Sequence, residues 1–93
     1  MATVVELAVF AGVGLFGTNG IPHFVQGVTG KRHMTPAGPE SSPVLNVLWG
    51  SFNFAVAGVL CWQYRDAIGA VTLSIAFVVG TVLALALASY WSE

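Results

Sequence analysis

Charged side chains are scarce in this chain, which has three Lys or Arg and four Asp or Glu among 93 residues. They make up 8% of the sequence, against about 25% in typical soluble domains. A soluble domain of this size needs a charged surface that this chain does not have. The net charge of −1 and the lack of a basic patch also argue against a nucleic-acid partner.

Cysteine occurs once, as Cys61, so an intramolecular disulfide is excluded and no Cys/His spacing resembles a zinc site. In its apolar run, this thiol is expected to pack as a small hydrophobic group. The sequence also offers no Ser–His–Asp constellation, no paired carboxylates and no phosphate-binding glycine motif. We therefore expect no catalytic residue, no cofactor and no metal site, and we do not expect an enzyme.

Three long apolar runs fill most of the chain, at about residues 3–21, 44–64 and 67–91. As helices, with a rise of about 1.5 Å per residue, they are long enough to cross a hydrocarbon core of about 30 Å. The sequence predicts an all-α integral membrane protein in which residues 1–93 form one domain with three transmembrane helices. The alternative for the first run is a shallow interfacial helix. An acid, Glu6, stands where a signal peptide has basic residues, so we expect the first run to be kept as an anchor.

Local signals predict where these helices end. Asn19 and Gly20 favour a helix C-terminus and Pro22 disfavours helical geometry before it, so the first helix is expected to stop near Ile21. A short interfacial turn would follow over residues 23–28, with its histidine toward water. Ser42 can cap the second helix with Pro43 at its first position. The interval 26–43 is then one long polar loop between the first two helices.

Three crossings place the polar residues on two sides of the membrane. Glu6 and Arg65 share one side and are expected to form an interhelical pair, although Glu6 could instead reach water alone or, less simply, couple to protons. The loop and the C-terminus share the other side. Lys31 and Arg32 favour a cytoplasmic loop and C-terminus with the N-terminus outside.

Two helix faces suggest how the helices pack. The third helix has small residues at four-residue intervals, a row along which another backbone can approach: Thr72, Ala76, Gly80, Ala84, Ala88 and Ser92. On the second helix, Asn46, Gly50 and Asn53 share one face, and their amides need hydrogen-bond partners in a dry environment. These amides either hold neighbouring helices together or line a polar cavity.

Candidate site residues gather on the loop side. The candidate polar site comprises Asn19, His23, His33, Asn46, Asn53 and Tyr90. A histidine pair can ligate haem or metal, but His33 lies in a Gly/Pro-rich loop and the spacing matches no usual ligand pattern. Lys31 and Arg32 are expected to meet lipid headgroups or a docking partner.

Residues 20–27, Gly-Ile-Pro-His-Phe-Val-Gln-Gly, and residues 41–50, Ser-Ser-Pro-Val-Leu-Asn-Val-Leu-Trp-Gly, resemble a group of short bacterial inner-membrane proteins of unassigned function. The His-Phe after a glycine-rich first span also looks faintly like DoxX-type membrane proteins. The first resemblance implies a multi-pass protein of the bacterial cytoplasmic membrane and implies no activity.

Together these features predict a small membrane protein that acts by association, either as a homo-oligomer or as an accessory subunit of a membrane complex. Its expected partners are the lipid bilayer and itself or another membrane protein. The alternative is an oligomeric transporter or channel, a holin-like pore included, and the third candidate is a haem or redox subunit.

Overall fold

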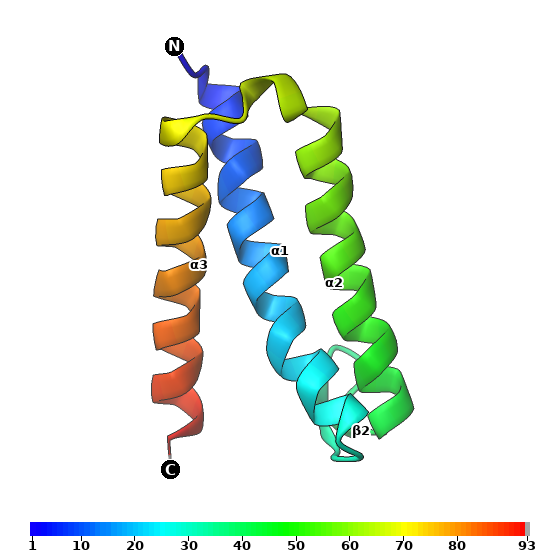
Figure 1. Cartoon of the computed structure of the whole chain (residues 1–93). Helices are drawn as coiled ribbons and strands as arrows, with labels where there is room; N and C mark the ends of the chain where they lie inside the picture. The colour runs from blue at the N-terminus through cyan, green and yellow to red at the C-terminus, as the bar shows by residue number, and fades with distance from the viewer. Residues whose placement is uncertain (93) are drawn as a thin grey trace.

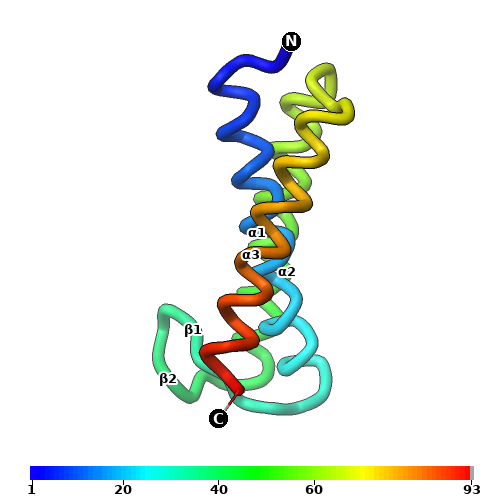
Figure 2. Tube along the Cα trace, turned by 90° about the vertical axis from the view of Figure 1, so that its left-hand side faces the viewer, coloured from blue at the N-terminus to red at the C-terminus, as the bar shows by residue number. Residues whose placement is uncertain are grey.

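In the computed structural model of residues 1–92, helix α1 (Val4–Val28) lies between α2 (Pro43–Gln63) and α3 (Ala70–Trp91) in a single layer (Figure 1). The layer is seen nearly edge-on in Figure 2, and the molecule measures 43 × 26 × 19 Å. The start of α1 and the α2–α3 connection lie at one end, and a small hairpin and the end of α3 lie at the other. The elements are α1 (Val4–Val28), β1 (His33–Thr35), β2 (Gly38–Ser41), α2 (Pro43–Gln63), the 3-10 turn η1 (Arg65–Ala67) and α3 (Ala70–Trp91).

All three helices are long and apolar enough to cross a membrane, which makes the fold compatible with a multi-pass membrane protein. The side chains are distributed accordingly. Among residues 1–92 the one buried large hydrophobic residue is Phe10, whereas Asn46 and Asn53 are buried and Phe77 is 72% exposed. Polar groups face the interior because lipid would leave their hydrogen bonds unmade.

Helix α1 does not stop at Ile21 as expected but continues through Pro22 to Val28. An interior proline removes one helical hydrogen bond, here to the carbonyl of Thr18, so something else must hold the last turns in helical geometry. His23 and Gly27, which follow the proline, are both buried on the face toward α2. The prediction of an interfacial turn with His23 toward water is therefore wrong, because tertiary packing overrides the local stop signal.

The stop signal that operates is Gly30, with a φ of 77°. The amide of Lys31 donates to the carbonyl of Gln26 at 2.8 Å, and that of Gly30 to the carbonyl of Gly27 at 3.0 Å. A glycine in left-handed geometry with a backbone bond reaching back five residues is the Schellman ending of a helix. It reverses the chain toward the hairpin.

The connection between α1 and α2 contains an antiparallel hairpin, which the sequence analysis did not predict. His33 pairs with Ser41 and Thr35 with Gly38, with a register shift between them. The hydroxyls of Thr35 and Ser41 lie 2.6 Å apart and are buried. Residues 33–41 are therefore an ordered element packed against the ends of α1 and α2.

The start of α2 is confirmed, because the Ser42 hydroxyl accepts from the Leu45 amide at 3.1 Å and Pro43 is the first helical residue. After α2, the turn η1 delays the third helix, which begins at Ala70 rather than near residue 67. There the Thr72 hydroxyl donates to the carbonyl of Ala67 at 2.6 Å and accepts from the amide of Gly69 at 3.0 Å. This buried threonine ties the start of α3 to the turn before it.

Candidate functional site

Two polar side-chain pairs cross the α1–α2 interface. The Asn19 amide donates from Nδ2 to Asn53 Oδ1 at 3.1 Å, and His23 Nδ1 lies 3.0 Å from Asn46 Oδ1. Asn53 also donates to the carbonyl of Trp49 at 2.8 Å. No buried side-chain nitrogen or oxygen within residues 1–92 is left without a partner. The structure thus brings together four of the six residues of the candidate polar site in bonded pairs.

Glycines let the two helices approach between these pairs. A Cβ atom on Gly50 would lie 2.7 Å from the backbone nitrogen of Phe24 and 2.9 Å from the carbonyl oxygen of Gly20. A Cβ atom on Gly27 would lie 2.5 Å from the carbonyl oxygen of Pro43. Real side chains do not fit at such distances, so the backbones themselves are in contact. This close approach brings the short asparagine and histidine side chains within bonding range.

Asn46 joins the hairpin to the helices. Its Nδ2 lies 3.0 Å from the carbonyl oxygen of His33 and 3.1 Å from those of Ser41 and Ser42. Its Oδ1 faces His23 on α1. One side chain, 0% exposed, therefore connects α1, α2 and both strands of the hairpin.

Aromatic rings form a continuous series across this end of the molecule. The His23 ring lies 6.5 Å from Trp49 and 5.2 Å from His33, measured between centroids. His33 in turn lies 4.8 Å from Trp91, near the end of α3. Trp91 also lies 4.8 Å from Tyr90, the last member of the predicted polar site. His33 is therefore held between α1 and α3.

The electrostatics at His33 follow from this placement. Burial, and then the neighbouring His23, lower the pKa of His33 below the ordinary value of 6.5. Both effects disfavour the charged ring, because a buried cation loses hydration and a second cation beside it repels it. His33 is accordingly neutral at pH 7.

The basic residues Lys31 and Arg32 are exposed beside the hairpin. Arg32 Nη1 donates to the carbonyl of Glu40 at 3.0 Å, which ties its guanidinium to the opposite strand. Both charges lie at the same end of the molecule as Trp91, which is 46% exposed. Cations beside exposed aromatic rings are typical of a headgroup-level surface.

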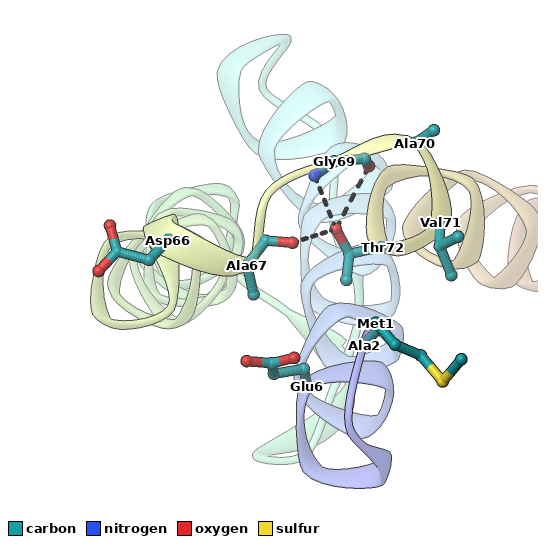
Figure 3. A pocket seen from close by; sticks show the side chains of 9 residues that line it. All are labelled: Met1, Ala2, Glu6, Asp66, Ala67, Gly69, Ala70, Val71 and Thr72. Carbon is teal, nitrogen blue, oxygen red and sulfur yellow. Dashed lines mark hydrogen bonds between the residues drawn. The ribbon is translucent and has the colours of Figure 1, made fainter.

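At the opposite end, Glu6 and Arg65 have partners other than the expected pair. Glu6 accepts from the Thr3 amide at 2.9 Å in a capping box. Arg65 donates to the carbonyl of Trp62 at 2.9 Å and lies 4.2 Å from the centre of that ring. Glu6 and Asp66 line a pocket of about 350 Å³, but in Figure 3 the Asp66 carboxylate points away from the other lining residues. The two carboxylates do not converge on one point.

The small-residue row of α3 divides into two parts. Thr72 and Gly80 are buried and Ala76 is half-buried, whereas Ala84 and Ala88 are exposed. Each four-residue step turns by about 40° around a helix with 3.6 residues per turn, so the row winds off the face toward α1. Within the chain, the row therefore contacts α1 only along its first half.

The contact that the row does make is with α1 of the same chain. A Cβ atom on Gly80 would lie 2.6 Å from Thr18 Oγ1, and one on Gly14 would collide with the backbone of Ala76. Toward the end of α3, α1 and α3 diverge (Figure 1). A groove of about 300 Å³ remains between Thr18, Ile21, Gly80 and Ala84.

No protein-family model, no curated protein and no solved structure matches this chain. Sequence reasoning missed Trp91 as the residue that meets His33, and it missed the hairpin. Gly50 was already part of the predicted asparagine face. Gly20 and Gly27 could have been recognised in the same way, because they lie at helical spacing beside Asn19 and His23.

Proposed function

We propose that this chain is a small multi-pass membrane protein that acts by association, through the open side of the α1–α3 pair. The observation that carries the proposal is the division of the small-residue row. Ala84 is exposed and lines the groove of about 300 Å³ that begins beyond the contact of Gly80 with α1. Small residues at an unfilled helix groove suit the close approach of a further helix in a bilayer.

The open layer supports the same conclusion. Because α1 lies between α2 and α3, the outer faces of both flanking helices are available to other chains. A second copy of this chain is the simplest occupant of the groove, which makes a homo-oligomer the first form of the proposal. An accessory subunit of a larger membrane complex is the second form.

The asparagine amides support association over transport as the role of the molecule. Asn46 and Asn53 are 0% and 1% exposed, and their hydrogen bonds are made within the chain. Amides used in this way hold helices together and offer little to a passing solute. An oligomeric transporter or channel would need a pathway formed between copies.

The remaining assignments belong to the same proposal. The resemblance of residues 20–27 and 41–50 to short bacterial proteins supports a bacterial cytoplasmic membrane. Lys31 and Arg32 support a cytoplasmic position for the hairpin end, with the N-terminus outside. The connection over residues 29–42 then acts as a polar cover that meets lipid headgroups or a docking partner.

The same Ala→Ile substitution on opposite faces of α3 tests the groove. Ala84→Ile fills it, whereas Ala86→Ile adds the same side chain on another face, at an exposed position that lines a separate depression with Val82 and Leu83. We expect Ala84→Ile to reduce the assembled species at least several-fold and Ala86→Ile to leave it unchanged. Native mass spectrometry from a mild detergent measures the assembly and identifies any second polypeptide, while circular dichroism confirms that both variants are folded.

Equal assembly of wild type and Ala84→Ile would contradict the groove as the contact. A wild-type protein that is monomeric and carries no second polypeptide would contradict association itself. Solute flux through liposomes that contain the pure protein would favour the transporter alternative.

A further inference from the structure

The hydrogen-bonding pattern of Asn46 fixes the proton on His23. Nδ2 of Asn46 faces three backbone carbonyl oxygens, which can only accept hydrogen bonds. If the amide were flipped, its Oδ1 would face these oxygens and the acceptors would repel each other. Oδ1 therefore faces His23 Nδ1 at 3.0 Å, and the ring nitrogen must be the donor. This bond selects the tautomer of the neutral ring in which the lone pair lies on Nε2.

This lone pair has no partner of its own within residues 1–92. His23 is 8% exposed, yet no fully buried side-chain nitrogen in that range lacks a hydrogen bond. Nε2 is therefore not fully buried, although most of the ring is. The result is an oriented imidazole with one nitrogen that has no hydrogen bond within residues 1–92.

A second imidazole lies beside the first, at a centroid separation compatible with one shared metal ion. The His23 and His33 ring centroids are 5.2 Å apart, with the rings inclined at 64°. With metal–nitrogen bonds of about 2.0 Å and a tetrahedral angle, two coordinated imidazoles have centroids roughly 5 Å apart. Trp91 packs on the His33 ring at 4.8 Å and limits where it can turn.

We infer that His23 and His33 form a two-histidine site for a divalent transition-metal ion of the imidazole-preferring class, with Asn46 as the positioning residue. Imidazole nitrogen suits Cu²⁺, Ni²⁺ and Zn²⁺, and the general affinity order places Cu²⁺ first. Asn46 does for His23 what outer-shell acceptors do for metal-bound histidines, since its Oδ1 accepts a hydrogen bond from the N–H of the other ring nitrogen.

The protein supplies two ligands, so water completes the coordination. Within residues 1–92, no group of three or more His, Cys, Asp or Glu side chains is placed to hold a metal ion. The positive charges of Lys31 and Arg32 also lie nearby and oppose cation binding. We therefore expect an exchangeable ion at an accessible site and no contribution of the ion to the folding of the three helices.

Electron paramagnetic resonance of Cu²⁺ added to the tag-free full chain in detergent tests the inference. Wild type is expected to bind one equivalent with hyperfine structure from two imidazole nitrogens. His33→Phe keeps an aromatic ring against Trp91 and should leave one nitrogen, with affinity at least tenfold lower. His23→Gln should do the same, and Gln63→Ala, at the opposite end, should match wild type.

The fold of the variant is checked separately. Circular dichroism and the oligomer size should be the same in His33→Phe and wild type, because the substitution removes a ligand and keeps the packing. Binding that is unchanged in His33→Phe, or a wild-type spectrum with fewer than two imidazole nitrogens, would overturn the site. Neither outcome bears on assembly through the α3 groove.

Discussion

The α1–α2 and α1–α3 interfaces share helix α1 but are built differently. The α1–α2 contact combines backbone approach at Gly20 and Gly50 with side-chain bonds from Asn46 and Asn53. The α1–α3 contact relies on close packing at Gly14 and Gly80 and ends half-way along α3.

The difference separates a contact with side-chain bonds of fixed geometry from a contact that depends on close packing alone. Close packing of small residues stabilises a pair of helices through backbone approach. Such a contact makes no side-chain bonds of fixed geometry, so another helix with small residues can take the same place. Amide and imidazole bonds have fixed geometry, and leaving them unmade in an apolar interior is costly. The α1–α2 pair is therefore expected to be the more firmly held part of the molecule, and the proposed partner contact lies on the α3 side.

The largest effect is expected from Asn46→Leu. The substitution removes the donors to the hairpin carbonyls and the acceptor for His23, and leaves those groups without partners. At about 0.6–1.7 kcal/mol per interhelical bond, we expect a loss of about 2–3 kcal/mol in the free energy of unfolding. Trypsin should then cleave faster after Lys31 and Arg32 in the hairpin region.

Asn53→Leu is the matched control for that variant. It replaces the same residue type on the same face of α2 but removes no bond to the hairpin. We expect a loss of about 1 kcal/mol and no change in hairpin cleavage. Cleavage after Arg65 serves as the internal reference in each digest. Equal hairpin cleavage in the two variants would show that Asn46 does not anchor the hairpin.

A smaller effect separates the glycines of the two interfaces. In Gly50→Ala the new Cβ meets backbone atoms of Phe24 and Gly20, which cannot move aside, and we expect a loss of about 1–3 kcal/mol. In Gly80→Ala the nearest atom is the Thr18 hydroxyl, which can rotate, so the loss should be smaller. Gly58→Ala meets nothing within 4 Å and should be neutral or slightly stabilising.

Unfolding in mixed micelles measures all three glycine variants under the same conditions. A loss for Gly80→Ala as large as that for Gly50→Ala would mean that the α1–α3 contact is as rigid as the α1–α2 contact. The distinction between a fixed pair and an exchangeable helix would then have to be abandoned.

Sequence reasoning succeeded where the signal was local or periodic. Ser42 and Pro43 mark a helix start by their own chemistry, and the spacing of Asn46, Gly50 and Asn53 defines a face without reference to the rest of the fold. Both are found in the structure.

It failed where distant residues decide the outcome. Pro22 reads as a helix end, but burial of His23 and Gly27 against α2 holds the helix past it. The hairpin has weak strand propensity, and Asn46, well outside its strands, holds it in place. The two histidines are ten residues apart, and only the reversal at Gly30 brings their rings together.

The smallest predicted effect, that of acidification, distinguishes the two interfaces by charge. Burial and the neighbouring His23 lower the pKa of His33 in the folded chain. The unfolded chain therefore takes up a proton on the His33 ring at a higher pH than the folded chain does. Stability is therefore fully present above about pH 6.5 and declines as the pH falls toward the folded pKa. The α1–α3 contact at Gly14, Thr18 and Gly80 has no group that titrates in this range.

Hydrogen exchange in the presence of a chelator measures this effect residue by residue. Between pH 7.5 and about pH 5, protection corrected for intrinsic exchange should fall in residues 33–41 and stay constant in the first turns of α3. Lys31 and Arg32 remain charged throughout and add a constant repulsion, so we assign the change itself to His33. His33→Phe should remove most of the dependence. An equal decline at both ends, or one that survives this substitution, would mean that His33 does not set the response of the hairpin to pH.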